Sequence, residues 1–467
     1  MSVSTIDAAA RTTGIIREPA VGLLVMGRKR PGFDPAWGAD VRARIDEVMN
    51  GLPWHVIVPS ENIADDAELS RVIDVCRTRS VDVLVLVQPT ISDGRLAPLL
   101  ARFWDRPLVL WATTERPEGE MISANSLVGT HVMTATLRQL GRPVEFVYGA
   151  PEEEETRRAL RRAISAVHAT TSIRSTKLGL IGYHAPGFVD FHSDPVFLAD
   201  RLGAQLYHMS TPELVDRVNS WDAPELEETI ASFRSLPVDL TTELPVTLDE
   251  ALAMQARYYR SFRELFSSER FDALAFRCWP DLPTMTGHWP YLALARLVSE
   301  GFPIAMEGDV DGALCSRIAE SATIGPVYLS DWLEHDRSTI TIWHTGAAPF
   351  QYAQPAPAQG APRIGVQFNN KKPSVVESTI RPGMDATLFR LWRFDGRYHM
   401  TALEGRTIEP RRHLLATNGL FETHDVDVRD WFEERIQIGM PHHVCLVEGF
   451  HRELLRRVAR LSGFVWC

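Results

Sequence analysis

The chain has few cysteines, and they form no pattern. Its five cysteines are an odd number in 467 residues, lie far apart and include no C-x-x-C pair. Such a set indicates neither a disulfide framework nor a zinc knuckle, and it fits a reducing compartment. We therefore expect a cytoplasmic protein.

Long apolar runs and blocks of basic residues are also missing. No apolar run approaches the ~18 residues that a membrane span needs, and the start of the chain lacks the charged-then-apolar order of a signal peptide. The net charge is -11, and no Lys/Arg block is of the kind that follows a phosphate backbone. Neither a membrane nor a nucleic acid is expected as a partner, and residues 1–17 are expected to be a disordered lead.

What remains is the composition of a large globular protein. With 467 residues and 45% hydrophobic content, the chain can bury a sizeable core and is too long for one ordinary domain. Over residues 18–170, Val/Leu/Ile runs such as VGLLVMG and VDVLVLV alternate with amphipathic stretches such as AELSRVIDVCRTR. Buried strands separated by helical segments are typical of parallel βαβ units. We predict a first open, Rossmann-like α/β domain here.

Two further domains are predicted. The run PEEEETRRALRRAISAV predicts a linking helix, because its acids precede its arginines in the order that the helix dipole favours. A second α/β series spans residues 171–346, from KLGLIGY through FPIAME to PVYLSDW and TITIWHTG. The stretch AAPFQYAQPAPAQGAPR is typical of a long loop. Residues 347–467 are rich in aromatic and β-branched residues, with a turn signal at Asp395-Gly396, and predict a β-rich domain.

In the second α/β series, three potential metal ligands follow predicted strands. Glu307 comes just after FPIAM, Asp331 ends PVYLS and His344 ends TITIW. Since open α/β sheets bind ligands outside the carboxyl ends of their strands, we expect the three to meet at one edge. Carboxylate and imidazole suit a divalent metal of the Mn²⁺ type that leaves room for a polyol substrate. The pair His442-His443 is a further candidate, of which only one would enter the site, because strand neighbours point to opposite faces.

Each of these residues also has a structural interpretation. Glu307 and Asp309 near a helix start would stabilise the helix dipole, and Asp331 occupies a position where helix caps and turn residues are common. His344, which precedes Thr-Gly, is typical of a hydrogen-bonded loop residue. Asp311 lies a helical turn beyond Glu307, and we expect it to face solvent.

Motifs along nearly the full chain resemble one family. RCWPDLP, MEGDVDGAL, a strand ending in SDW and HTGAAP follow one another in the order seen in the L-fucose isomerase and L-arabinose isomerase superfamily. The segments GYHAPGF, SANSLVGTH and MPHHVCLVEG resemble further parts of that family, so the resemblance runs from about Val21 to Gly449. It implies a Mn²⁺-dependent isomerase that interconverts an aldose and a ketose through an enediol.

Matched residue by residue, the resemblance implies roles for individual side chains. Glu307 and Asp331 match the two carboxylates that bind the metal and act as catalytic acid/base groups. His344 matches a histidine ligand of the arabinose branch, and His443, or with a weaker match His442, corresponds to the C-terminal histidine ligand. The resemblance also implies a homo-oligomer, hexameric or trimer-based. The native cation, whether Mn²⁺, Co²⁺ or Mg²⁺, stays open.

The substrate is less defined, because the sugar-contacting segments match neither named enzyme. We predict a monosaccharide substrate, which is contacted by Trp279 and His442 and, from a neighbouring subunit, by Gln88 and Asn125. Basic residues near the expected mouth of the site would suit an anionic sugar such as the sulfonated sugar sulfoquinovose: Arg28, Arg30, Lys371 and Lys372.

Two other classes of protein fit the same sequence. A non-catalytic sugar-binding protein can be built from two α/β layers and needs no acids placed for proton transfer. A metal-dependent aldolase, lyase or hydrolase can use the same ligands, because a metal that stabilises an enediolate also suits retro-aldol cleavage. A bound metal would argue against the first class, and conserved substrate mass would argue against the second.

Overall fold

The structure is a computed structural model that describes residues 18–28, 33–58, 62–92 and 94–467. Contacts between these residues divide the chain into two compact units. The N-terminal unit ends at Thr171 and includes Arg460–Ser462, and the C-terminal unit holds Ser172–Ala459 and Gly463–Cys467. The disordered lead expected over residues 1–17, and Arg30 of the predicted basic pair, lie outside the described residues.

The N-terminal unit is built on one parallel sheet with the strand order β2-β1-β3-β4-β5. Its strands are β1 (Ala20–Val25), β2 (His55–Ile57), β3 (Val83–Gln88), β4 (Leu108–Ala112) and β5 (Val144–Tyr148). The connecting helices are α2 (Pro35–Asn50), α3 (Asp66–Thr78), α4 (Leu96–Phe103) and α5 (Ser126–Gln139). β3 and β4 are buried along their whole length, as strands covered on both faces must be. The predicted linking helix is confirmed as α6 (Glu154–Arg174), which carries the chain into the next unit.

The C-terminal unit contains a second parallel sheet, with the strand order β7-β6-β8-β9. Its strands are β6 (Lys177–Ile181), β7 (Gln205–Met209), β8 (Ala273–Phe276) and β9 (Ile304–Ala305). Its helices are η1 (Val189–Phe191), α7 (Pro195–Leu202), α8 (Thr211–Ser220), α9 (Ala223–Arg234), α10 (Leu248–Ser268), α11 (Asp281–Thr286), α12 (Tyr291–Ser299) and α13 (Val310–Ser321).

The rest of this unit forms a nine-stranded sheet with the order β12-β13-β16-β11-β10-β17-β14-β15-β18. Its strands are β10 (Tyr328–His335), β11 (Thr339–His344), β12 (Arg363–Val366), β13 (Pro373–Thr379), β14 (Asp385–Phe394), β15 (Arg397–Ile408), β16 (Thr417–Glu422), β17 (His443–Glu448) and β18 (Val465–Trp466). Shorter elements are η2 (Phe350–Tyr352), α14 (Val428–Ile436) and α15 (Arg452–Ser462). The predicted fold class, two parallel α/β sheets and a β-rich C-terminal part, is confirmed.

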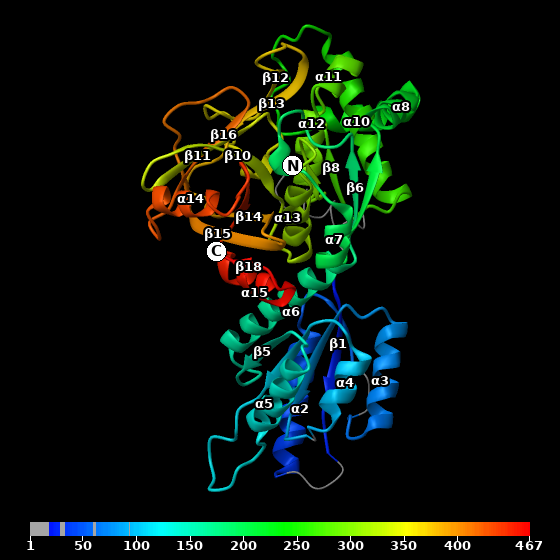
Figure 1. The fold of residues 1–467 in the computed structure, drawn as a ribbon, viewed down its shortest axis with the longest axis vertical. Helices are drawn as coiled ribbons and strands as arrows, with labels where there is room; N and C mark the ends of the chain where they lie inside the picture. The colour runs from blue at the N-terminus through cyan, green and yellow to red at the C-terminus, as the bar shows by residue number, and fades with distance from the viewer. Residues whose placement is uncertain (1–17, 29–32, 59–61, 93) are drawn as a thin grey trace. The chain divides into compact units, whose positions relative to one another are not determined.

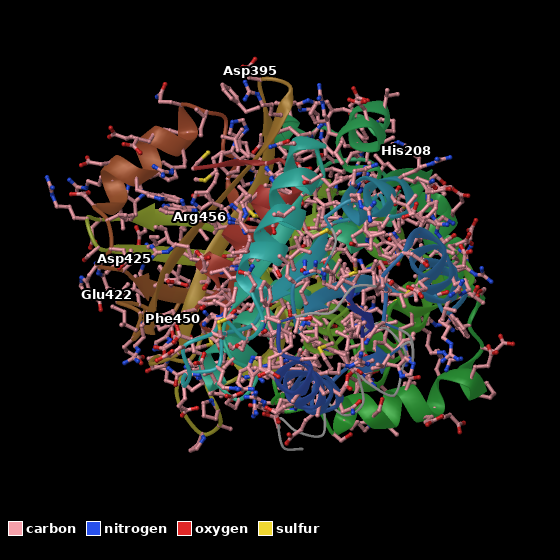
Figure 2. All side chains as sticks on the ribbon, turned by 90° about the horizontal axis from the view of Figure 1, so that it is seen from below. His208, Asp395, Glu422, Asp425, Phe450 and Arg456 are labelled. Atoms are coloured by element: carbon pink, nitrogen blue, oxygen red, sulfur yellow. The ribbon has the colours of Figure 1, made fainter. Side chains whose placement is uncertain are left out.

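The turn predicted at Asp395-Gly396 joins β14 to β15. Both residues have positive φ, 47° and 67°, which a tight two-residue hairpin turn requires. Asp395 lies at the outer end of this hairpin (Figure 2). None of the helices in the described ranges is both long and apolar enough to cross a bilayer.

The strands PVYLS and TITIW lie in a different sheet from the one predicted. As β10 and β11 they pair antiparallel with each other, and their outer neighbours β17 and β16 are antiparallel as well. The nine-stranded sheet therefore begins along the chain before the expected boundary at residue 346. Short buried β-branched runs look alike in parallel and antiparallel sheets, so the sequence pattern did not separate the two. The argument from parallel carboxyl ends applies to Glu307 alone.

Helix α13 lies between the two sheets of the C-terminal unit (Figure 1). It packs on β8 and β9 on one side and on β14 and β17 on the other. All of its residues are buried, since a helix covered on both sides has no solvent face. The prediction that Asp311 faces solvent was therefore wrong: its side chain is buried and accepts a hydrogen bond from Arg393 at 3.2 Å.

Candidate functional site

Three adjacent strands of the nine-stranded sheet carry potential metal ligands. β10 lies between β11 and β17, and in this register Asp331 of β10 is directly opposite His443, the first residue of β17. His344 ends β11 and follows Trp343, which lies opposite Asp331 on the other side. Side chains directly opposite each other in a sheet share one face. The register of β10 and β17 thus puts a carboxylate and an imidazole on one face, and the His344 ring at the end of β11 lies 5.2 Å from the His443 ring, centroid to centroid.

Glu307 reaches the same place from the parallel sheet. It follows β9 with a left-handed backbone (φ 62°), and its carbonyl accepts a hydrogen bond from Ala185 N at 2.8 Å. The next residue, Gly308, is also left-handed, and a Cβ there would lie 2.2 Å from the carbonyl oxygen of Tyr183. Only glycine fits so close to another backbone segment. In this tight turn the Glu307 carboxylate contacts Trp279, His443 and His344.

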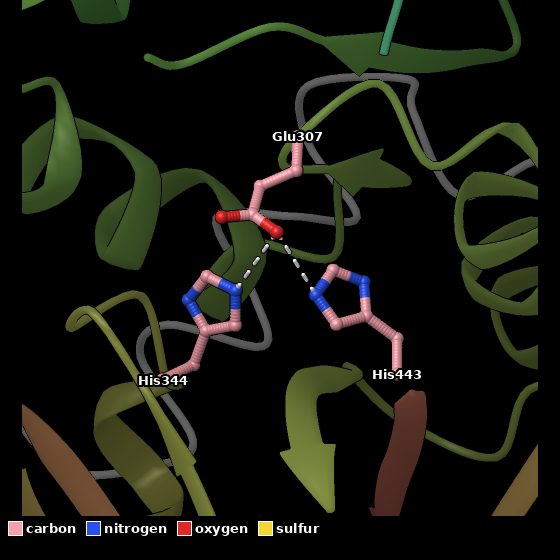
Figure 3. Close-up of side chains that lie close together, drawn as sticks. All are labelled: Glu307, His344 and His443. Carbon is pink, nitrogen blue, oxygen red and sulfur yellow. Dashed lines mark ion pairs between the residues drawn. The ribbon is translucent and has the colours of Figure 1, made fainter. Parts of the chain in front are cut away.

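The helix cap expected in this segment is Asp309 rather than Glu307. Asp309 is the N-cap of α13, and its carboxylate accepts a hydrogen bond from Gly312 N at 2.8 Å. One oxygen of Glu307, Oε1, accepts a hydrogen bond from the indole of Trp279 at 2.8 Å. The other oxygen, Oε2, lies 3.3 Å from Nε2 of His443 and 3.9 Å from Nε2 of His344, as Figure 3 shows.

Asp331 and His442 form the open side of this cluster. Oδ1 of Asp331 lies 3.4 Å from Nε2 of His443 and 3.9 Å from Nε2 of His442. The opposite nitrogen of His442, Nδ1, is held by Asp190 at 2.6 Å. Both Asp331 and His442 are partly exposed, whereas Glu307, His344 and His443 are buried. The cluster therefore has a closed inner part and an accessible outer part.

A second layer of contacts fixes the orientation of His443. Its Nδ1 lies 2.9 Å from Asp309 Oδ2, and Arg390 donates to both oxygens of Asp309 at 2.6 and 2.8 Å. A carboxylate bound to one nitrogen of a histidine is the arrangement that turns the other nitrogen toward a metal. Nε2 of His443 is buried and has no hydrogen-bond partner among the described residues. An imidazole nitrogen in that position can bind a metal once it has lost its proton.

The electrostatics of the site keep its groups in different protonation states. Burial raises the pKa of Glu307, but the neighbouring His443 and His344 imidazoles outweigh this effect and lower it to about 2. Burial lowers the pKa of His443, yet the Asp309 and Glu307 carboxylates raise it to about 9. Burial lowers the pKa of His344, although the Asp331 and Glu307 carboxylates oppose this effect. A proton on His443 therefore balances the carboxylates in the metal-free chain.

The donor set fits a divalent cation. Glu307, His344 and His443 each offer an atom within 4.8 Å of the others, and so do Asp331, His442 and His443. Mixed carboxylate and imidazole ligands suit Mn²⁺ and related ions. The unpartnered Nε2 of His443 and its carboxylate-held Nδ1 agree with such a site.

The cluster opens into a cavity of ≈ 610 Å³ whose wall is rich in aromatic residues. Glu307, Asp331 and His442 line it together with the predicted substrate contact Trp279. A volume of this order suits a small polar ligand such as a monosaccharide. Its other aromatic wall residues are Phe188, Trp289, Tyr291, Trp332, Trp343 and Phe368.

The structure thus brings together six of the predicted site residues: Glu307, Asp331, His344, His442, His443 and Trp279. Both histidines of the pair are present, not one as predicted, because His442 precedes β17 and does not follow the alternation of the strand. Of the other described candidates, Gln88, Asn125 and Arg28 lie in the N-terminal unit. Gln88 is fully buried and accepts a hydrogen bond from Ser92 N at 2.9 Å. Asn125 precedes α5 in a left-handed conformation (φ 54°), and Arg28 follows β1. The substrate roles of these three residues stay predictions.

Sequence reasoning missed Asp190 and Arg390, and it missed the orienting role of Asp309. Asp190 comes two residues after the GYHAPGF motif, and its closeness to that motif could have marked it as a candidate. Arg390 sits in the middle of β14 among apolar residues, and only the packing of β14 on α13 shows that its partner is Asp309. A pairing over 81 residues of sequence leaves no local pattern.

Comparison with known proteins gives relatives of one activity. Sulfoquinovose isomerases from Priestia aryabhattai and Priestia megaterium are each 24% identical over 439 residues, which cover 93% of this chain and 96% of theirs. The sulfoquinovose isomerase of Alkalicoccus urumqiensis is 27% identical over 390 residues, covering 81% of this chain and 84% of its own. These relatives confirm the prediction of an enzyme, an intramolecular oxidoreductase of the aldose–ketose isomerase class.

No family model matches the chain. Membership of the L-fucose and L-arabinose isomerase superfamily therefore stays a prediction. Among solved structures, an ABC transporter solute-binding protein from Burkholderia multivorans covers 66% of this chain and 93% of its own, with 14% identity and a TM-score of 0.19. A likeness of that size carries no argument about fold or function.

Proposed function

We propose that this chain is a metal-dependent sulfoquinovose isomerase, which interconverts the 6-sulfonated aldose and its 2-ketose through an enediol. The observation that carries the proposal is the cluster of Glu307, Asp331, His344 and His443 at the wall of a sugar-sized cavity. The substrate is proposed from relatives named sulfoquinovose isomerase, which match 81–93% of the chain.

Glu307, Asp331, His443 and His344 are the residues that would hold the cation. When bound, a divalent cation would supply positive charge that stabilises the negative charge developing as the enediol forms. Three of these ligands are buried, so the charge acts in surroundings where electrostatic interactions are strong.

The two carboxylates are placed to move protons. Isomerisation transfers one proton from C2 to C1 and another from O2 to O1, and each transfer needs an acid/base group within hydrogen-bond reach. Glu307 and Asp331 approach the same space from different sheets, so they can address different parts of one substrate. We assign the carbon-bound proton and the oxygen-bound proton to this pair jointly. The outer carboxylate, Asp331, is 26% exposed, which gives transferred protons a route to water.

The aromatic wall and His442 position the sugar. The rings of Phe188 and Trp279 pack edge to face with centroids 5.6 Å apart. The Phe188 ring also packs on His442, with centroids 4.7 Å apart. Such surfaces accept the apolar C–H faces of a sugar ring and exclude water around the reacting carbons. Asp190 binds Nδ1 of His442, and the other ring nitrogen, Nε2, lies toward Asp331. His442 would thus contact a substrate oxygen.

A positive charge lies beside the cavity for the sulfonate. Lys372 follows the lining residue Asn370, and its Nζ donates to the carbonyl of Pro283, which also lines the cavity. Lys372 N donates to Asn370 Oδ1 at 3.1 Å, which fixes this turn between β12 and β13. We assign the anionic end of the substrate to Lys372.

Proton NMR of sulfoquinovose with the Mn²⁺-loaded protein in D₂O tests the function directly. We expect ketose signals and deuterium at the reacting carbon, with the mass of the sugar conserved apart from isotope exchange. Glucose, fucose, arabinose and ribose serve as comparison substrates. Smaller fragments would indicate an aldolase instead of an isomerase. Binding of the sugar without deuterium exchange would indicate a sugar-binding protein.

We also propose that the active form is a homo-oligomer, as the family resemblance implies. Size-exclusion chromatography with light scattering gives the mass in solution. A mass of one 52.4 kDa chain at working concentration would reject this part of the proposal.

A further inference from the structure

The four tryptophans of the cavity wall have no N–H left for a substrate. Each indole donates to an acceptor of the protein: Trp279 to Glu307 at 2.8 Å, Trp289 to Asn370 at 3.1 Å, Trp332 to His335 at 2.9 Å and Trp343 to the carbonyl of Leu415 at 2.7 Å. Thr284 also donates into the protein, to the carbonyl of Pro280 at 2.7 Å. The wall therefore offers a sugar mainly ring faces at these positions.

Tyr291 differs from the tryptophans. It opens α12 and lines the cavity, and its ring stacks on Trp289 with centroids 5.4 Å apart and an interplanar angle of 13°. The side chain is fully buried, yet its hydroxyl has no hydrogen-bond partner within the described ranges. Cys278 and Thr345 lie near this hydroxyl, and Thr345 already contacts Nδ1 of His344.

A buried hydroxyl without a partner is costly, and proteins keep such a group where a ligand pairs with it. Burial, together with the charges of Cys278 and Glu307, raises the pKa of Tyr291 well above its ordinary value, so the hydroxyl keeps its proton. Tyr291 lines the same cavity as Glu307 and Asp331. The wall of this cavity therefore includes a protonated hydroxyl donor without a partner among the described residues.

We propose that Tyr291 donates a hydrogen bond to a hydroxyl oxygen of the sugar beside the reacting carbons, and so determines which aldoses the enzyme accepts. This inference rests on the proposed function, because it needs a sugar in the cavity. A site that pairs its buried donor with one substrate hydroxyl rejects sugars that lack or misplace this hydroxyl. Tyr291 is thus a specificity residue distinct from the metal ligands.

Tyr291→Phe tests the inference, because it removes the hydroxyl and keeps the ring stacked on Trp289. We expect kcat/KM for the accepted aldose to fall roughly 10²-fold. Mn²⁺ affinity should be unchanged, and the Tm should be equal or higher, since the variant loses an unpaired polar group. Wild-type kcat/KM in a folded, metal-loaded variant would overturn the inference.

Tyr352→Phe is the matched control. Tyr352 is buried in η2, donates to the carbonyl of Pro326 at 2.7 Å and accepts from Glu448 N at 3.1 Å, outside the cavity wall. This variant loses real partners, so its Tm should fall while kcat/KM stays at the wild-type value. A purely structural role for Tyr291 would instead give both variants the same pattern.

Monodeoxy analogues of the accepted aldose identify the partner hydroxyl. The wild-type enzyme should lose activity strongly with one analogue, and Tyr291→Phe should discriminate against that analogue at least tenfold less. Equal discrimination by both proteins with every analogue would reject the hydrogen bond. If the wild-type protein isomerises no sugar at all, the proposed function has failed. This result differs from a Tyr291→Phe variant that keeps the wild-type kcat/KM, which would reject the role of Tyr291 alone.

Discussion

The cavity side and the inner side of His443 differ in how completely their polar atoms are paired. On the inner side, Asp309 is saturated by Arg390, Gly312 and His443 itself. On the cavity side, Oε2 of Glu307 and Nε2 of His443 face each other at 3.3 Å, and the nitrogen has no hydrogen-bond partner in the described part of the chain. Two acids separated by one residue thus serve different ends: Asp309 is structural, and Glu307 is available for chemistry.

The largest effect on activity is expected from the cavity side. Glu307→Gln keeps the shape and removes the charge, so the Mn²⁺ site loses a ligand and the reaction loses an acid/base group. Removal of such a group alone costs roughly 10²–10⁴-fold in rate, and the loss of metal should add to this. We expect a normally folded protein with no measurable turnover, checked by circular dichroism, metal analysis and the NMR assay. A metal-replete, active variant would contradict the assignment.

A substitution on the inner side of His443 should lower the free energy of unfolding. Asp309→Ala leaves the buried guanidinium of Arg390 without its partner, and breaking such a pair costs about 3–5 kcal/mol in the free energy of unfolding. Denaturant unfolding of the metal-free proteins gives this number. Asp309→Ala combined with Arg390→Met should recover part of the loss, because no charge is then left buried. Equal stability of Glu307→Gln and Asp309→Ala would remove the distinction between the two sides.

The pH dependence of metal binding sharpens the same comparison. The pKa of His443 is raised to about 9 in the metal-free chain, so at pH 7 its ring carries a proton that must leave before Nε2 can bind a metal. Mn²⁺ affinity should therefore rise roughly tenfold per pH unit between about pH 6 and 8 and level off above the pKa. Calorimetry in buffers of different ionisation enthalpy should report about one proton released. Affinity that does not change with pH would show that His443 is neutral beforehand.

The smallest effect is expected at the mouth of the cavity. Lys372→Met should lower kcat/KM for sulfoquinovose about tenfold, since a partly exposed charge contact is worth on the order of 1 kcal/mol, and it should leave uncharged glucose unaffected. The neighbouring Lys371 is exposed, and Lys371→Met is the matched control with no expected change. Equal losses for the charged and the uncharged sugar would show that Lys372 supports the turn rather than the sulfonate.

Much of this arrangement was accessible from the sequence, because the patterns that carry it are local. Alternating apolar runs and amphipathic stretches predicted both parallel sheets, and the acid that follows FPIAM pointed to Glu307. The antiparallel setting of Asp331 and His344 was not predicted, since the buried first residues of β10 and the residues of β11 show no alternation that distinguishes them from parallel strands. Asp311 was misplaced because the second layer that covers α13 comes from strands more than 70 residues further on.

The turn over residues 367–372 has a consequence for how this enzyme can change over evolutionary time. Gln367 folds the turn on itself by accepting from the backbones of Asn369 and Asn370 at 2.8 and 3.0 Å. It lines the cavity from a hairpin loop, whereas the proposed metal ligands lie in β strands and in the tight turn before α13. Loops of this kind accept substitutions and changes of length at little cost in stability. Substrate preference can therefore drift at this hairpin while the proton-transfer chemistry is inherited intact, so related chains with divergent sequences here need not share a sugar.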